Sequence, residues 1–478
     1  MTGTGFMKPI IQFLGISACL IFLSAQSEAQ SQWTVHEWGT FTSLQNEAGE
    51  AIGGINTDDE PVPDFVHRLA HLLLLPPTEV PTIYFQGAPK CHPDVTMRLE
   101  TPVLYFHPPA NYSGIQTANV RVQFRGGWLT EFYPDAIANA PGLTNGWFNF
   151  GPLKSDTVSE LKWNDLKVGG DWPVTNTSAH VWTSPRAVQS ALVKTPNDES
   201  EKFLFYRGVA HIDAPLRISR SGEELLFHSQ LENLPVNRAL TLRSVWLVDI
   251  QPDEKLAFRA LPSLTLDGDS TKILARTSAS FETKDYHSGN LKELRSALKK
   301  ALIAEGLFSD EADALLNTWE LSYFKSAGLR VFFTVPREWT DFYLPLEISP
   351  AATIERVMVG RIELVTPDQR SILQTLGECA PPQIQSDAVQ MRTDFYAEVP
   401  RSAQSPKAAK FSKVDAGTLP LSSVISIPKT YEAYLKLGRF RNALLLDAAR
   451  QNTALTNFIT AYALAGHDPQ KRAIHATK

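Results

Sequence analysis

The chain has 478 residues, of which 43% are hydrophobic and 20% are charged, and its net charge is −6 at pH 7. This composition is that of a globular protein with ample material for a large core. An acidic balance without a basic domain excludes the usual footprint of nucleic-acid binding, so we expect no nucleic-acid partner.

Residues 1–29 have the pattern of a signal peptide. A lysine precedes the apolar run PIIQFLGISACLIFLSA, and Ser27 and Ala29 fit a small-residue cleavage site. The sequence ISAC, which ends at Cys19, resembles a lipoprotein box, but the apolar run continues beyond it, which argues against lipid anchoring. We expect an exported protein, periplasmic or extracellular, with no transmembrane span in the mature chain, because no later segment is long and apolar enough.

Residues 30–287 are predicted to form a β-rich domain with sandwich-like sheets. Short runs rich in Val, Thr, Phe, Tyr and Trp alternate with Gly, Pro, Asn and Asp, as in VLYFH, VRVQFRGGW, KFLFYRGVA and LRSVWLVDI. The fold class is therefore expected to be mainly β in this region.

The stretch WTVHEWGTFTSL opens this domain and places His36 beside Glu37 in a predicted strand. Because side chains alternate along a strand, Glu37 shares the more apolar face with Val35, while His36 shares the other face with Trp38. An unpaired carboxylate on an apolar face is costly. Glu37 therefore needs a partner, either a structural Arg or Lys or a metal site in which it is the general base.

One helix is expected within the domain, in the stretch PDFVHRLAHLLLL after Pro63. Its apolar residues recur at helical spacing. His67 and His71 lie four residues apart on the opposite face, with Asp64 three residues before His67. This helix face would present two imidazoles and a carboxylate.

These side chains and three further histidines of the same region are candidate metal ligands. Imidazole and carboxylate groups suit Zn²⁺ or another divalent transition metal ion. The candidate set is His36, Asp64, His67, His71, His92 and His107. The alternatives are that Asp64 only caps the helix, that the helical histidines are solvated, and that the remaining histidines are structural.

Residues 288–399 are predicted to form an α+β segment. A helix is expected from Asn290 to a stop at Gly306, and a second begins at Ser309, where Asp310 and Glu311 suit the positive end of the helix dipole. The runs LRVFFTVP and ERVMVGRIELVTP follow as strands.

The segment VPREWTDFYLPL is dense in aromatic residues beside charged ones. Such a platform suits a sugar or a peptide, and we take Trp38, Arg337 and Trp339 as candidate binding residues. A packed domain interface explains the same composition equally well.

Residues 400–428 have the composition of a linker, and residues 429–478 are expected to form a helical tail. Two cysteines, Cys91 and Cys379, remain after removal of the signal peptide. Export permits a disulfide between them, and two free thiols are the alternative.

The motif HEWGTFT at 36–42, together with LETPVLYFH, FLFYRGV and GLRVFFTVPREWTDFYLPLEI, resembles a family of exported bacterial proteins that has no assigned activity. The resemblance covers most of the mature chain. It implies bacterial export and one shared architecture, and it transfers no catalytic roles.

Two hypotheses of function remain. The first is an exported envelope or extracellular binding protein with a glycan, peptide or protein ligand. The second is a metal-dependent hydrolase with its histidine-rich site in the N-terminal region. The familiar motifs of hydrolases, NTPases and dehydrogenases do not occur in the sequence, which ranks binding first.

Overall fold

The computed structural model describes residues 33–57, 60–70, 73–74, 91–110, 112–143, 150–231, 234–235, 238–398 and 427–462. The predicted signal peptide, nearly all of the linker and the last part of the helical tail lie outside these ranges.

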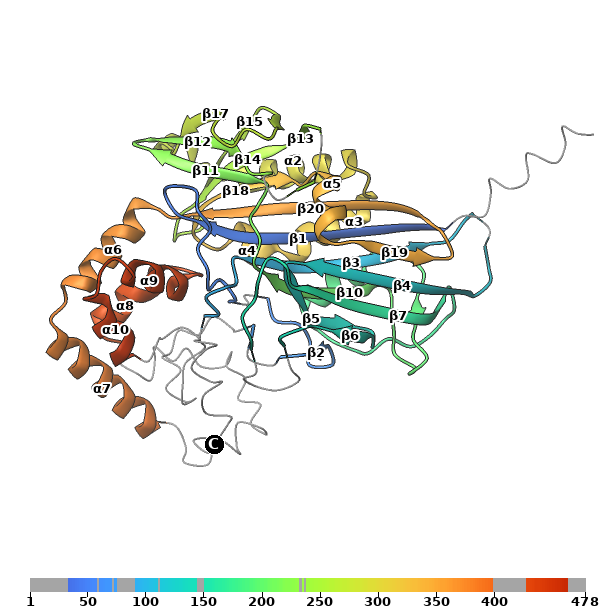
Figure 1. Ribbon diagram of the computed structural model, residues 1–478, viewed down its shortest axis with the longest axis horizontal. Helices are drawn as coiled ribbons and strands as arrows, with labels where there is room; N and C mark the ends of the chain where they lie inside the picture. The colour runs from blue at the N-terminus through green and yellow to red at the C-terminus, as the bar shows by residue number, and fades with distance from the viewer. Residues whose placement is uncertain are drawn as a thin grey trace, which may run out of the picture.

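A large mixed sheet forms the body of the molecule (Figure 1). Its strands follow the order β15 (Leu256–Leu261), β14 (Val245–Ile250), β18 (Gly328–Thr334), β20 (Thr353–Leu364), β1 (Thr34–Gln45), β3 (Met97–His107), β10 (Leu204–Ala210), β5 (Gly127–Tyr133), β7 (Val158–Val168), β4 (Gln116–Arg125) and β19 (Leu346–Ser349). Four short strands attach to it: β2 (His67–Arg68), β6 (Ile137–Asn139), β8 (Val193–Lys194) and β9 (Ser200–Glu201).

Strand β1 lies at the centre of this sheet and is buried on both faces. It pairs with β20 in parallel over all twelve residues and with β3 in antiparallel on its other side. The predicted alternation is confirmed, because Val35 and Phe41 belong to the core on one face and Trp38 belongs to the core on the other. Strands β18, β19 and β20 come from the segment 288–399, so both sides of residue 287 contribute to one sheet.

Different layers cover the two faces. On the Val35 face lie a sheet of β11 (Leu216–Ser221), β12 (Glu224–Ser229) and β17 (Ile273–Ser278), a pair of β13 (Leu240–Leu242) and β16 (Leu264–Leu266), and helix α5 (Arg337–Tyr343). The Trp38 face is covered by helices α1 (His180–Arg186), α2 (Asn290–Ala304), α3 (Ser309–Thr318) and α4 (Glu320–Phe324).

The C-terminal helices gather at one end of the sheet, in orange and red in Figure 1. They pack with Leu44, near the end of β1, in a third core. They are α6 (Pro367–Glu378), α7 (Pro381–Glu398), α8 (Lys429–Leu435), α9 (Arg441–Ala449) and α10 (Leu455–Ala461). The predicted fold class is thus confirmed: the chain is rich in β-strands, with an α+β part and a helical C-terminal segment.

The helices expected at 290 and 309 are present as α2 and α3, and the strands expected after them are β18 and β20. The helix predicted after Pro63 is wrong over the residues described. Asp64 and Phe65 form a turn, and His67 and Arg68 form β2, which pairs with β5. The apolar side chains that suggested one helical face enter separate cores: Val66 packs on the Trp38 face, whereas Leu73 joins the C-terminal helices.

The centre of β1 has room only for a glycine, at position 39. The register between β1 and β3 shifts between Trp38 and Thr40. A Cβ atom on Gly39 would lie 2.8 Å from Sδ of Met358 and 3.0 Å from Cα of Pro102. Strands β3 and β20 therefore approach β1 more closely than an alanine permits.

We expect Gly39→Ala to lower the free energy of unfolding by about 1–3 kcal/mol, because overpacking a buried strand forces its neighbours apart. Urea unfolding measures this. Gly268→Ala is the matched control, since a Cβ there would meet nothing within 4 Å, and its stability should be unchanged. Equal stability of the two variants would contradict the close packing around Gly39.

Candidate functional site

Two histidines meet on the helix-covered face of the sheet. His36 of β1 is opposite Tyr105 of β3, and Thr34 is opposite His107, so the two imidazoles come from adjacent strands. Alternation directs both to the same face. Their ring centroids lie 5.0 Å apart.

Helix α3 brings a buried carboxylate to these rings. Nδ1 of His36 donates to Oε2 of Glu311 at 2.7 Å, and Nε2 of His107 donates to Oε1 at 2.9 Å. The backbone N–H of Phe308 also donates to Oε2, at 2.8 Å, because Glu311 is the third residue of the helix and its side chain reaches back to the N-cap residue. The carboxylate thus joins the start of α3 to both strands.

The environment of Glu311 keeps it ionised. Burial alone raises the pKa of this carboxyl, but the hydrogen bonds from His107 and His36 outweigh that effect and lower the pKa to about 2. The ring of Phe308 lies over both imidazoles, 4.4 Å from His36 and 4.9 Å from His107 between centroids. An anion therefore lies between two imidazoles beneath an aromatic cover.

The donor atoms of His36, His107 and Glu311 all lie within 4.8 Å of one another. Within the described part of the chain, this is the group of His, Cys, Asp or Glu side chains that is arranged to hold a metal ion. Two imidazoles and one carboxylate match the ligand types that zinc and related ions take in proteins.

The structure brings together only two of the six predicted ligands. Nε2 of His67 lies 2.9 Å from Oε2 of Glu199, in a separate place beside β5. His92 is buried, and its Nε2 donates to the carbonyl of Gly151 at 3.0 Å. Asp64 is exposed in the turn before β2, and His71 lies outside the described residues. Asp64 and His67 lie apart because the expected helix is absent over residues 64–70.

Glu37 points to the opposite face from His36. Its Oε1 accepts the hydroxyl of Tyr206, and its Oε2 lies 2.5 Å from the guanidinium of Arg356, which also contacts Asp341 at 2.9 Å. Burial lowers the pKa of Arg356, but the neighbouring carboxylate of Glu37 outweighs this and raises it. Of the two partners considered for Glu37, the structure thus shows a structural arginine, Arg356.

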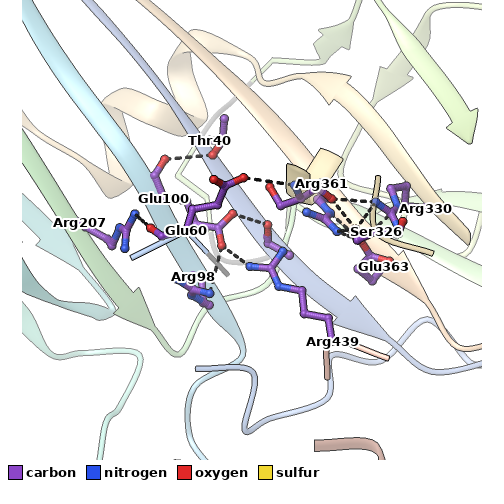
Figure 2. Close-up of polar contacts among 12 residues, drawn as sticks. Thr40, Glu60, Arg98, Glu100, Arg207, Ser326, Arg330, Arg361, Glu363 and Arg439 are labelled. Atoms are coloured by element: carbon purple, nitrogen blue, oxygen red, sulfur yellow. Dashed lines mark hydrogen bonds and ion pairs between the residues drawn. The ribbon is translucent and has the colours of Figure 1, made fainter. Parts of the chain in front are cut away.

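Figure 2 shows a second polar cluster, which contains Glu100, Arg98, Arg361 and Arg439. Glu100 of β3 accepts from Thr42 at 2.8 Å and lies 2.6 Å from Arg439 of the C-terminal region. Burial raises the pKa of Glu100, yet Arg439, Arg98 and Arg361 together lower it to about 2. These contacts tie the C-terminal helices to β1 and β3, which is a structural role.

The candidate binding residues are divided between core and surface. Trp38 and Trp339 are buried, and Trp339 packs 5.0 Å from Phe41 and 4.7 Å from Tyr343 between ring centroids. Arg337 is exposed and lies 3.5 Å from Glu355 at the rim of a groove. The aromatic segment thus serves mainly as core.

Cys91 and Cys379 are free thiols, so the candidate disulfide is not formed. Burial raises the pKa of Cys91 to about 12. Cys379 ends helix α6, where its Sγ lies 3.2 Å from the carbonyl of Thr375. The two thiols serve local packing in different places.

Sequence reasoning recognised His36 and His107 but missed Glu311 as their partner. Glu311 drew notice only as an acidic residue in the first turn of a helix. No spacing in the sequence connects residue 311 with residues 36 and 107, because only the pairing of β1 with β3 and the packing of α3 bring them together.

No family model and no curated protein matches the chain. Among solved structures it is similar to the Fcho1 mu homology domain of Danio rerio with a bound Eps15 peptide, at a TM-score of 0.26 and 11% identity, covering 72% of this chain and 98% of that one. It is also similar to the yeast delta-COP-I mu-homology domain complexed with a Dsl1 WxWxV peptide. Here the TM-score is 0.23 and the sequence identity 10%, and the match covers 70% of this chain and 96% of that one. Scores this low carry no argument about fold or function.

Among the helices of the described ranges, none combines the length and the hydropathy that crossing a bilayer requires.

The Glu37–Arg356 pair gives a prediction about stability. Glu37→Leu leaves the buried guanidinium of Arg356 with fewer partners. It should lower the free energy of unfolding by about 3–5 kcal/mol. Adding Arg356→Met should recover part of that loss, because both charges are then removed. Urea unfolding of the two single variants and the double variant measures the coupling, and a double variant whose loss equals the sum of the single losses would contradict it.

The low pKa of Glu311 gives a prediction about pH. Its ordinary value is 4.5 and its folded value is about 2. Ionisation therefore stabilises the fold above pH ~4.5, and this contribution is lost as the pH falls toward 2. The free energy of unfolding of wild type should exceed that of Glu311→Gln by about 3 kcal/mol at neutral pH, and the difference should shrink below pH ~4.5.

Urea unfolding of both proteins at pH 7, 5, 4 and 3 measures this difference. A gap that stays constant over that range would show that the ionised form of Glu311 is not what holds α3 to the strands.

Proposed function

We propose that this protein is an exported protein that binds a divalent transition metal ion through His36, His107 and Glu311. The observation that carries the proposal is the convergence of these three donors within 4.8 Å. Export is supported by the signal-peptide pattern of residues 1–29 and by the resemblance to an exported bacterial family.

The geometry suits an ion after a small adjustment. A zinc ion lies about 2.0–2.1 Å from imidazole nitrogen, so neighbouring ligand atoms in a tetrahedral site are about 3.3 Å apart. The contacts of Glu311 with His36 and His107 are hydrogen bonds of 2.7 and 2.9 Å. Loading therefore needs each imidazole nitrogen to move roughly 0.5 Å away from its carboxylate oxygen. All three donors already lie within 4.8 Å of one another, so the movements needed to reach the tetrahedral spacing are small.

Binding replaces two N–H···O hydrogen bonds by metal–ligand bonds. Each imidazole must then present an unprotonated nitrogen to the ion, so its proton moves to the other ring nitrogen, and an imidazolium also loses one proton to solvent. Protons therefore compete with the metal ion, and binding strengthens as the pH rises. The ionised carboxylate of Glu311 lowers the cost of bringing a cation into a buried place. Three protein ligands leave one coordination position for water or a small ligand.

We assign no reaction to the site. The general base considered from the sequence was Glu37, and its carboxylate lies on the opposite face of β1 in contact with Arg356 and Tyr206. The hydrolase hypothesis therefore lacks its base, and binding is the function that the described residues support.

The test is metal binding by the purified mature protein. We expect one equivalent of Zn²⁺ or Co²⁺ by elemental analysis after gel filtration, with affinity rising between pH 6 and 8. Co²⁺ should give the strong visible bands of a tetrahedral site. His36→Gln, His107→Gln and Glu311→Gln should each weaken binding at least tenfold.

His67→Gln is the matched control, because His67 also contacts a carboxylate but lies away from this group. It should bind like wild type. The thermal melting temperature of each variant without metal separates loss of ligands from loss of fold. A wild-type protein that binds no ion would overturn the proposal. So would equal metal affinity of the His67→Gln control and the three variants at His36, His107 and Glu311.

A further inference from the structure

Strand β20 has one edge that is only half covered. It pairs with β1 along all twelve residues from Thr353 to Leu364. On its other side it pairs with β18 only from Val359 to Leu364. The half of β20 from Thr353 to Val357 therefore has no strand beside it among the described residues.

The direction of the backbone groups follows from two hydrogen bonds. The N–H of Thr353 donates to the carbonyl of Trp33 at 2.9 Å, toward β1. The carbonyl of Met358 accepts from the N–H of Val335 at 2.9 Å, on the opposite side. Because backbone groups alternate along a strand, the N–H and C=O of Ile354 and Arg356 point to the uncovered edge.

The chain itself turns away from this edge. Strand β18 ends at Thr334, and after Val335 comes Pro336, which precedes helix α5. Proline has no N–H and cannot continue the ladder. Exposed strand edges of this kind are templates for another extended chain, and proteins usually protect them.

A groove lies beside one part of this edge. It has a volume of about 360 Å³, and Glu355, Arg356 and Val357 of β20 line it. Its walls come from the start of α5, from Glu305 after helix α2, and from the segment 238–243, which includes part of β13. Thr334, Val335 and Pro336 also line the groove, so it adjoins the point where the chain of β18 leaves β20.

Charges of both signs line the walls of the groove. Arg243 pairs with Glu305 at 2.8 Å, Arg337 pairs with Glu355 at 3.5 Å, and Arg238 pairs with Glu338. The arginines are well exposed, and such exposed pairs exchange partners at little cost. They are able to meet acidic or basic side chains that alternate along an extended ligand.

We propose that an extended peptide segment of a partner protein binds here by adding a strand to β20 opposite Thr353–Val357. Five residues of strand span about 17 Å. The peptide makes main-chain hydrogen bonds to Ile354 and Arg356, and its side chains alternate between the two charged walls. This is recognition by β-strand addition, in which the backbone supplies affinity and the walls supply selectivity.

The shape of the groove favours a single chain over a second copy of this protein. One end of the groove is closed by Val335 and Pro336, and elements of both faces flank it. A sheet edge of a second copy would bring its own flanking elements into the same narrow space. The proposal is independent of metal binding at His36.

Hydrogen exchange tests the edge directly. Mass spectrometry with electron-transfer fragmentation resolves single amides. In the protein alone, the amides of Ile354 and Arg356 should exchange at least a hundredfold faster than those of Thr353, Glu355 and Val357, which point to β1. Equal protection of all five amides would show that the edge is already covered and would overturn the proposal.

Peptide binding is tested with a displayed library of random heptapeptides, selected on the wild-type protein. The best sequence is synthesised and its affinity is measured by fluorescence anisotropy. Ile354→Pro removes an N–H that points to the edge without a strand and removes no bond to β1, and it should weaken binding at least tenfold. Ile354→Val keeps that N–H and should bind like wild type.

Melting temperatures of the free variants show whether Ile354→Pro folds. If it does not fold, hydrogen exchange of the wild-type protein is compared with and without the peptide. Binding should then slow amide exchange at Ile354 and Arg356 alone. Failure to select any peptide, equal affinity of the proline variant, or protection elsewhere would each overturn the proposal. A dimer in light scattering whose formation protects Ile354 and Arg356 would assign the edge to a second copy instead.

Discussion

A buried ionised carboxylate must have partners, and this requirement connects the parts of the structure that are distant in sequence. Glu37 holds Arg356 of β20 against β1, and Glu311 holds α3 against His36 and His107. Both contacts reach β1, which is itself buried on both faces. Removing a charge from water costs several kcal/mol unless paired charges and hydrogen bonds compensate it. The central strand is therefore held in register by polar groups from β20 and from α3.

The alternation along β1 gives its adjacent polar residues different roles. Glu37 enters the face that packs on the small sheets, where an arginine compensates it. His36 lies on the face beneath the helices, where it contacts the carboxylate of Glu311 and the imidazole of His107. One face thus carries a structural ion pair, and the other carries a set of donors suited to a cation.

Part of this was predictable from residue patterns alone. The alternation of β1, the need of Glu37 for a partner and the helices beginning near 290 and 309 follow from local periodicity and capping. The helix after Pro63 was predicted on the same grounds and is wrong over the described residues, because pairing of His67 and Arg68 with β5 and burial in separate cores prevailed over helical spacing. Local periodicity cannot show which core a side chain will enter.

The candidate site shows the same limit. The enrichment of histidines near the N-terminus pointed to His36 and His107, but it gave equal weight to His67 and His92, which lie elsewhere. Glu311 is 204 residues from His107 along the chain. Its role depends on the antiparallel pairing of β1 with β3 and on the packing of α3, which are long-range consequences of the fold.

The most direct measurement of the central claim is anomalous diffraction at the zinc absorption edge, from crystals of the purified protein grown with zinc. The expected result is one strong peak about 2.0–2.2 Å from Nδ1 of His36, Nε2 of His107 and a carboxylate oxygen of Glu311. Crystals grown with zinc that show no peak there, and in which both histidines still donate hydrogen bonds directly to Glu311, would contradict it.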